Sequence, residues 1–252
     1  MEVPPERLVS TTHKNKVMSK KCIIVPAFNE AENIAAVIEG IRKESDADIV
    51  VIEDGSIDQT GEKARRAGAL VITHPFNLGY GAALQTGYKY GLKKDYDFLV
   101  QMDGDGQHDP KSIPELFREV ETGACDVAIG SRFLGKKSYP VGSLKFLGIK
   151  LFRIVIRLAT GQTITDPTSG YQCLNRRVFR VFTEDLFPCD YPDANIIILL
   201  HRMGYRIKEV PVAMLPNSEG RSMHRGVFRV SYYFFEMFLS LFVTLLRDKK
   251  GR

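Results

Sequence analysis

The first half of the chain alternates between short apolar runs and stretches with one polar face. The apolar runs occupy residues 22–25, 49–52, 70–73, 97–100 and 127–130. Short runs bounded by polar turns are typical of strands that are buried on both faces of a parallel sheet. After the first run, apolar side chains return at helical spacing, at Ile34, Val37, Ile38 and Ile41. This spacing predicts a helix that begins near Glu30, with Asn29 as its cap.

The order of these elements predicts the fold class. Strands and helices alternate at short spacing, which favours an α/β domain built on a parallel sheet. In such sheets, ligands bind beyond the carboxyl ends of the strands. Polar or charged segments follow the apolar runs, at residues 26–30, 53–56, 77–81, 103–107 and 131–132. We therefore expect these segments to lie at the same edge of the sheet.

Two carboxylates follow the fourth apolar run. Residues i and i+2 of an extended chain point to the same side, so Asp103 and Asp105 can enter one crevice. Gly104 leaves room beside them for a ligand. Paired oxygen donors suit Mg²⁺ or Mn²⁺, which keep open positions for substrate phosphates, and Gln107 and His108 are candidate third ligands. For this segment alone, an acidic turn without a metal is the alternative interpretation.

Composition and short motifs exclude several classes. The chain has 252 residues and a formal net charge of +5. This mild positive charge is compatible with phosphate ligands or an anionic membrane. We expect no nucleic-acid partner. The four scattered cysteines form no Cys-x-x-Cys pair, so we expect buried thiols in a reducing compartment and no zinc site. A Walker phosphate loop is absent. The Gly79–Gly81 segment has Leu84 where a dinucleotide fingerprint needs its third glycine.

Two later stretches point to a membrane surface or a partner. Residues 144–159 alternate apolar side chains with four basic ones, which predicts an amphipathic helix for an acidic headgroup or phosphate, or else a solvated face. Residues 227–246 are the most apolar part of the chain, yet Glu236 lies in their middle. Packing on the domain, an interfacial helix and a homo-oligomer contact compete for this segment, and we favour packing combined with one of the other two.

The motifs occur in the order seen in family 2 glycosyltransferases of the GT-A fold, which the chain resembles. They are Pro26-Ala27-Phe28-Asn29-Glu30, Glu53-Asp54-Gly55-Ser56, Asn77-x-Gly79-x-Gly81, Asp103-Gly104-Asp105-x-Gln107 and Gly130-Ser131-Arg132. Residues 166–171 and 209–212 resemble the polyprenyl-phosphate sugar synthases, such as dolichyl-phosphate mannose synthase. The resemblance runs from about Cys22 to about His224 and implies a catalytic domain at residues 21–225. The polar residues 1–20, which show no periodicity, predict a flexible leader before it, and the apolar residues 226–252 predict a helix after it.

The resemblance also implies a donor site for a nucleoside diphosphate sugar, with GDP-mannose or UDP-glucose preferred. Its lining would be Pro26, Ala27, Asn29, Glu30, Glu53, Asp54, Asn77, Gly81, Asp103 and Gly104. Mg²⁺ or Mn²⁺ on Asp103, Asp105 and Gln107 would bridge the diphosphate and stabilise charge on the leaving oxygen. Transfer would invert the anomeric centre through an oxocarbenium-like transition state.

The acceptor expected from the resemblance is a dolichyl or undecaprenyl phosphate, whose ionised oxygen needs no strong base. Arg132 suits bidentate binding of that phosphate. Further phosphate contacts are expected at Lys145 and, in a mobile acceptor loop at residues 217–224, at Arg221, Ser222 and His224. A glycan hydroxyl would instead need a base, for which Asp193 is the best candidate; the other role of Asp193 is a helix N-cap.

The sequence therefore predicts a metal-dependent hexosyltransferase, peripheral at the cytoplasmic, inner face of a membrane. Two alternatives stay open. One is a transferase that acts on a glycan hydroxyl in cell-wall or exopolysaccharide synthesis. The other is a nucleotide-sugar-binding protein without transfer activity.

Overall fold

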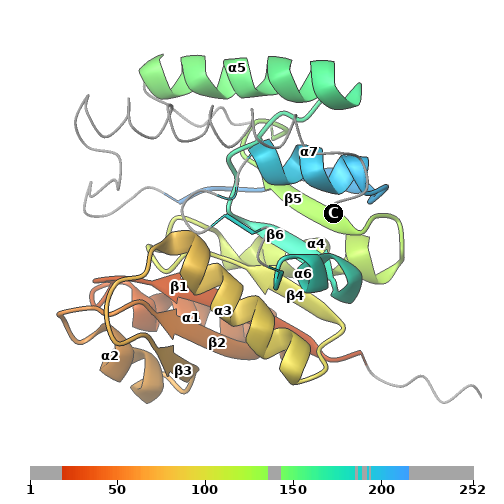
Figure 1. Cartoon of the computed structure of the whole chain (residues 1–252). Helices are drawn as coiled ribbons and strands as arrows, with labels where there is room; N and C mark the ends of the chain where they lie inside the picture. Colours follow the sequence, from red (N-terminus) through yellow and green to blue (C-terminus); the bar gives the residue numbers. More distant parts are fainter. Residues whose placement is uncertain (1–18, 136–142, 185–186, 189–191, 193, 216–252) are drawn as a thin grey trace, which may run out of the picture.

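The computed structural model describes residues 19–135, 143–184, 187–188, 192 and 194–215. They build one sheet with the strand order β3-β2-β1-β4-β6-β5-β7 (Figure 1). The strands are β1 (Lys21–Ala27), β2 (Asp48–Glu53), β3 (Leu70–Thr73), β4 (Phe98–Gln101), β5 (Val127–Ser131), β6 (Gln172–Asn175) and β7 (Ile207–Pro211). Each of the five apolar runs is a strand, which confirms the prediction of an α/β sheet.

One strand departs from the predicted parallel arrangement. β6 lies between β4 and β5 and runs antiparallel to both, whereas β1, β2, β3, β4, β5 and β7 pair in parallel where they are neighbours. An antiparallel strand begins at the edge where its parallel neighbours end. The segment that leads into β6 therefore reaches the same edge as the loops that follow β4 and β5.

Helices cover both faces of the sheet. They are α1 (Ile34–Glu44), α2 (Thr60–Arg66), α3 (Tyr80–Lys93), the 3₁₀ turn η1 (Pro110–Ser112), α4 (Ile113–Glu121), α5 (Ser143–Thr160), α6 (Arg176–Val181) and α7 (Ala194–Arg202). Along β1, Ile24 belongs to the core beneath α3, α5, α6 and α7, and Ile23 to the core beneath α1, α2 and α4. This alternation buries both faces of the strand, as the unbroken apolar run predicts.

The first predicted helix begins at Ile34 rather than near Glu30, and its predicted cap is wrong. Asn29 does not cap α1, because the chain first makes a turn in which the amides of Asn33 and Ile34 donate to the Glu30 carbonyl. Asn29 instead has a positive φ of 57°. Its side-chain Oδ1 accepts a hydrogen bond of 3.0 Å from the amide of Ile57, so it joins the loops after β1 and β2.

The predicted amphipathic helix at residues 144–159 is α5. In Figure 1 it lies outermost, above α7, and Phe152 and Ile156 on its inner side belong to the core that α7 shares. Cys22, Cys125 and Cys173 are free and buried, as expected. Within the described residues, no helix has the length and hydropathy that crossing a membrane requires. Residues 1–18 of the predicted leader at 1–20, and residues 216–252 with the predicted C-terminal helix at 226–252, lie outside the described residues.

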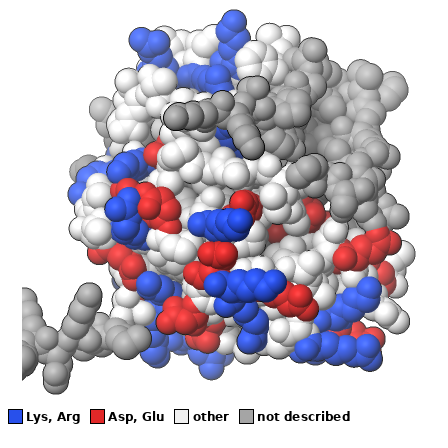
Figure 2. All heavy atoms as spheres, turned by 180° about the vertical axis from the view of Figure 1, so that it is seen from behind, with Lys and Arg blue, Asp and Glu red and all other residues white. Residues whose placement is uncertain are grey.

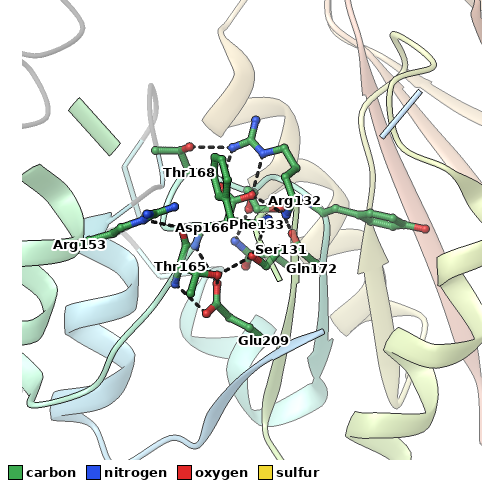
Figure 3. Close-up of polar contacts among 12 residues, drawn as sticks. Ser131, Arg132, Phe133, Arg153, Thr165, Asp166, Thr168, Gln172 and Glu209 are labelled. Carbon is green, nitrogen blue, oxygen red and sulfur yellow. Dashed lines mark hydrogen bonds and ion pairs between the residues drawn. The ribbon is translucent and has the colours of Figure 1, made fainter. Parts of the chain in front are cut away.

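A buried ion pair joins the end of β5 to the segment before β6 (Figure 3). Arg132 Nε donates to Asp166 Oδ2 at 2.7 Å, and an Nη of Arg132 donates to Asp166 Oδ1 at 2.6 Å. The same Nη donates to the Thr168 hydroxyl at 3.0 Å. Asp166 is completely buried, and 9% of the Arg132 side chain is exposed. The bidentate geometry fixes the guanidinium and the segment together.

Glu209 of β7 stabilises the segment that carries Asp166. The amides of Thr165 and Asp166 both donate at 2.7 Å to the carboxylate of Glu209. The Thr165 hydroxyl donates to the same carboxylate at 2.9 Å and lies 2.6 Å from the hydroxyl of Ser131. Strands β5 and β7 therefore hold the segment before β6 through side chains as well as through the sheet.

We expect Asp166→Asn to lower the free energy of unfolding by about 3–5 kcal/mol, because it leaves the guanidinium of Arg132 buried without its counter-charge. The matched control is Glu62→Gln, which breaks the exposed pair with Arg66. It should cost less than about 1 kcal/mol. Urea denaturation measures both values, and equal losses in the two variants would contradict a dominant role for the buried pair.

Candidate active site

The two carboxylates predicted to bind a metal follow β4, at the carboxyl edge of the sheet. Asp103 is oriented by Tyr80, whose hydroxyl donates to Asp103 Oδ1 at 2.8 Å. The Asp103 side chain is 28% exposed, so solvent and ligands reach it. Gly104 packs against β1, where an added Cβ would lie 3.2 Å from the carbonyl oxygen of Pro26 and 3.3 Å from the Cβ of Ala27. Any larger residue at position 104 would press on the start of the predicted donor loop.

Negative charge accumulates around these carboxylates. Burial raises the pKa of Asp105, and the nearby charge of Asp103 raises it further. Burial also raises the pKa of Glu30, with additional contributions from Asp105 and Asp103 and an opposing hydrogen bond from Asn33. Glu30 thus belongs to the same acidic group as the two aspartates. A divalent cation would relieve the repulsion between them.

His108, a candidate third ligand, instead makes a hydrogen bond and a stacking contact within the protein. Its Nδ1 accepts a hydrogen bond of 3.1 Å from the amide of Asp103, which leaves the proton of the neutral ring on Nε2. Nε2 lies 3.8 Å from Asp103 Oδ2. Burial lowers the pKa of His108 to about 4, so the ring is neutral near neutral pH. It stacks on Tyr171 at a centroid distance of 4.7 Å. His108 is therefore a support for the loop and not a ligand in this arrangement.

The oxygen ligands offered by the two aspartates fit a hard divalent cation whose remaining coordination positions are filled by substrate. Among the described residues, no three His, Cys, Asp or Glu side chains form a ready-made metal cluster. Asp103 and Asp105 offer carboxylate oxygens, and Mg²⁺ in particular binds through one or two carboxylates together with water and substrate phosphates. The backbone amide of Gln107 donates to Asp105 Oδ1 at 2.9 Å, and its backbone carbonyl accepts from the amide of Leu215 at 2.7 Å. Both contacts hold Gln107 beside the acidic pair.

Apart from Asp103 and Gly104, which follow β4, the predicted donor-binding residues lie at the ends of β1 and β2, on the loops after β1, β2 and β3, and at the start of α3. Pro26 and Ala27 end β1, and Glu53 ends β2 with its carboxylate accepting from the amide of Ser56. The amide of Glu30 donates to the Thr60 hydroxyl at 2.8 Å. Asn77 is exposed on the third loop, and Gly81 is buried in the first turn of α3. The expected residues therefore share this edge.

Asp54 has a structural task that its sequence context does not reveal. Its carboxylate accepts from the amides of Leu78 and Gly79, each at 2.9 Å, and from the ring of His74 at 2.7 Å. The other ring nitrogen of His74 lies 2.9 Å from the Thr86 hydroxyl. Asp54 and His74 are both buried. Together they fix the entry into α3 and hence the position of Tyr80.

The loops after β2 and β3 are in direct contact. Gly55 has a φ of 68°, and a Cβ there would lie 2.4 Å from the carbonyl carbon of Phe76. Glycine is needed for both the backbone conformation and the space. Exposed apolar side chains line this part of the edge, at Phe28, Ile57, Phe76 and Leu78. Such a rim suits the flat, partly apolar surface of a nucleobase.

On the predicted acceptor side, Arg132 and Arg153 both lie close to the ring of Phe133. The guanidinium carbons lie 5.6 Å and 4.6 Å, respectively, from the ring centroid of Phe133. Arg153, from α5, also donates through Nε to the Thr165 carbonyl at 2.7 Å. Figure 3 shows both arginines directed toward the segment that carries Asp166. The same network also holds two carboxylates, those of Asp166 and Glu209, which balance the two guanidinium charges.

Several predicted acceptor residues lie outside the described part of the chain. They are Asp193, Arg221, Ser222, His224 and the side chain of Lys145. Their assignment stays a prediction. Sequence reasoning missed Tyr80 and His74. Tyr80 is the unspecified position between Gly79 and Gly81 in the predicted motif, and His74 precedes that motif by three residues.

Comparison with known proteins agrees with this arrangement. The model of the family described as glycosyl transferase family 2 matches residues 22–182. An undecaprenyl-phosphate mannosyltransferase of Micrococcus luteus is 30% identical over 216 residues, 81% of this chain and 86% of that protein. A polyprenol monophosphomannose synthase of Mycolicibacterium smegmatis is also 30% identical, over 81% of this chain and 80% of that protein.

A solved structure shares the fold. Glucosyl-3-phosphoglycerate synthase from Mycobacterium tuberculosis, crystallised with Mn²⁺, UDP and glucosyl-3-phosphoglycerate, superposes with a TM-score of 0.68 at 20% identity. The match covers 92% of this chain and 82% of that one. The predicted GT-A fold and the resemblance to polyprenyl-phosphate sugar synthases are both confirmed. The chain belongs to glycosyl transferase family 2 and is a glycosyltransferase.

Proposed function

We propose that this enzyme transfers a hexose from a nucleoside diphosphate sugar to a polyprenyl phosphate, with Mg²⁺ or Mn²⁺ bound at Asp103 and Asp105. The observation that carries the metal assignment is the crowding of these two carboxylates at the carboxyl edge of the sheet. The names of the relatives from Micrococcus luteus and Mycolicibacterium smegmatis support a polyprenyl phosphate as acceptor. Mn²⁺ and UDP in the fold relative support the donor class.

Different residues at the carboxyl edge of the sheet would have separate roles in the reaction. Asp103 and Asp105 would hold the ion, which when bound neutralises charge that develops on the leaving diphosphate. The loops at residues 26–30 and 53–56 would hold the nucleoside, beside the apolar rim. Arg132, held by Asp166, would position the acceptor phosphate. That phosphate oxygen is already ionised, so no side chain needs to remove a proton from it.

The outer face of α5 supports a membrane-surface location. It exposes Leu147, Leu151, Ile154 and Leu158, which repeat at helical spacing. Lys150 and Arg157 are exposed on the same helix, and residues 143–160 include no acidic side chain. Figure 2 shows basic and uncharged atoms at the top of the molecule, where α5 lies, and mixed charges below. Apolar and basic side chains on one face suit the interface of an anionic bilayer.

We expect Asp105→Asn to weaken metal-dependent donor binding by more than about 100-fold, which exceeds the usual effect of losing an outer-shell partner. Calorimetric titration of GDP-mannose and UDP-glucose, with and without Mn²⁺, measures this loss. The matched control is Asp109→Asn, four residues further along the same loop, where an amide can keep the cap that Asp109 forms with the Lys111 amide. Unchanged metal-dependent binding in Asp105→Asn would refute the metal assignment.

The acceptor class is tested by transfer assays with undecaprenyl phosphate, dolichyl phosphate and soluble glycans in parallel, each with the donor that binds. We expect turnover with a polyprenyl phosphate and none with free glycans. Turnover with a glycan hydroxyl alone would replace the proposed acceptor and make a general base necessary. Donor binding without turnover on any of these acceptors would contradict the proposed transfer to a polyprenyl phosphate.

A further inference from the structure

Tyr80 reaches the acidic pair from a different element of the fold. It is the first residue of α3, which follows β3, whereas Asp103 follows β4. Its backbone position is fixed because the amides of Leu78 and Gly79 donate to the buried carboxylate of Asp54. The phenol then spans the gap between the loops and donates to Asp103 Oδ1 at 2.8 Å. A hydrogen bond to an ionised carboxylate is stronger than one between neutral groups.

Gly170 lies against the hydrogen bond between Tyr80 and Asp103 and leaves no room there for a side chain. A Cβ at position 170 would lie 2.7 Å from the Tyr80 hydroxyl oxygen and 3.4 Å from each carboxylate oxygen of Asp103. The φ of Gly170 is not positive, so space and not backbone conformation demands glycine here. The neighbouring Ser169 hydroxyl donates to the Gly130 carbonyl, and Asp166 is held by Arg132. The backbone at position 170 is therefore anchored and cannot easily recede.

We propose that Tyr80 is a positioning residue for the metal ligand Asp103, and that Gly170 is required because it leaves room for the Tyr80 hydroxyl. This inference rests on the proposed function, since it takes Asp103 as a ligand. The hydroxyl holds one carboxylate oxygen and so limits rotation of the Asp103 side chain. An oriented ligand binds a cation more tightly than one that must first be ordered. Loss of an outer-shell partner typically lowers metal affinity 10- to 100-fold.

The first comparison is between Tyr80→Phe and Tyr90→Phe. Tyr90 lies on the same helix, and its ring packs against Tyr96 at a centroid distance of 6.4 Å. Mn²⁺ affinity is measured by electron paramagnetic resonance of free Mn²⁺, with saturating GDP or UDP. We expect Tyr80→Phe to bind Mn²⁺ about 10-fold more weakly, within the range for an outer-shell partner, and Tyr90→Phe to match the wild type.

The second comparison tests Gly170 through its dependence on Tyr80. We expect Gly170→Ala alone to weaken Mn²⁺ binding by about 10-fold or more, because its methyl group displaces the hydroxyl from Asp103. In a Tyr80→Phe background the atom that the methyl group would strike is absent. The same glycine substitution should then change Mn²⁺ affinity by less than about twofold, since its remaining contacts of 3.4 Å are ordinary van der Waals distances.

The possible results separate this inference from the proposed function. Wild-type affinity in Tyr80→Phe, or an equal effect of Gly170→Ala in both backgrounds, would overturn the role of Tyr80 while leaving the metal site in place. A wild-type protein that binds no Mn²⁺ with either nucleotide would overturn the metal site itself, and the inference with it. Thermal unfolding of each variant shows whether it is folded, and the two tyrosine variants decide the question if Gly170→Ala does not fold.

Discussion

The buried ion pair between Arg132 and Asp166 is the interaction on which the proposed acceptor side of this enzyme depends. Removing two charges from water is costly, and their attraction offsets that cost only when their remaining hydrogen-bonding groups find partners. Thr168 accepts from the guanidinium, and the carboxylate of Glu209 accepts from the amide of Asp166. Segments that are far apart in the sequence thereby become one rigid unit at the carboxyl edge of the sheet.

Charge along that edge is balanced in one half and unbalanced in the other. Glu30, Asp103 and Asp105 bring negative charges together, whereas Arg132 and Arg153 lie in a network that also holds the carboxylates of Asp166 and Glu209. In the proposed reaction both substrates carry phosphate groups that repel each other. A divalent ion on the acidic side would neutralise the diphosphate of the donor, and Arg132 would meet the acceptor phosphate from the other side.

The fold was predictable to the extent that its strands are apolar runs. β6 escaped prediction because only Cys173 and Leu174 of its four residues are apolar, and its antiparallel direction depends on partners far along the chain. Because ligands bind beyond the carboxyl ends of parallel strands, Asp103 and Asp105 could be predicted to lie at the site from the sequence. The same reasoning missed Tyr80, because the group that Tyr80 contacts is 23 residues away and nothing in the local sequence marks that contact. Asn29 shows that a residue typical of caps can serve a long-range contact instead.

The antiparallel course of β6 has a consequence for how this scaffold can diversify. The proposed nucleotide side is made from loops that leave β1, β2 and β3, whereas the opposite side includes a loop that enters a strand. The connection from β5 to β6 carries α5 and returns to the sheet beside β4. The outer part of this connection can change in length and composition without disturbing the register of the first four strands, as long as Thr165, Asp166 and Gly170 keep their contacts. In the proposed reaction, such changes would alter the acceptor while the opposite loops keep the donor.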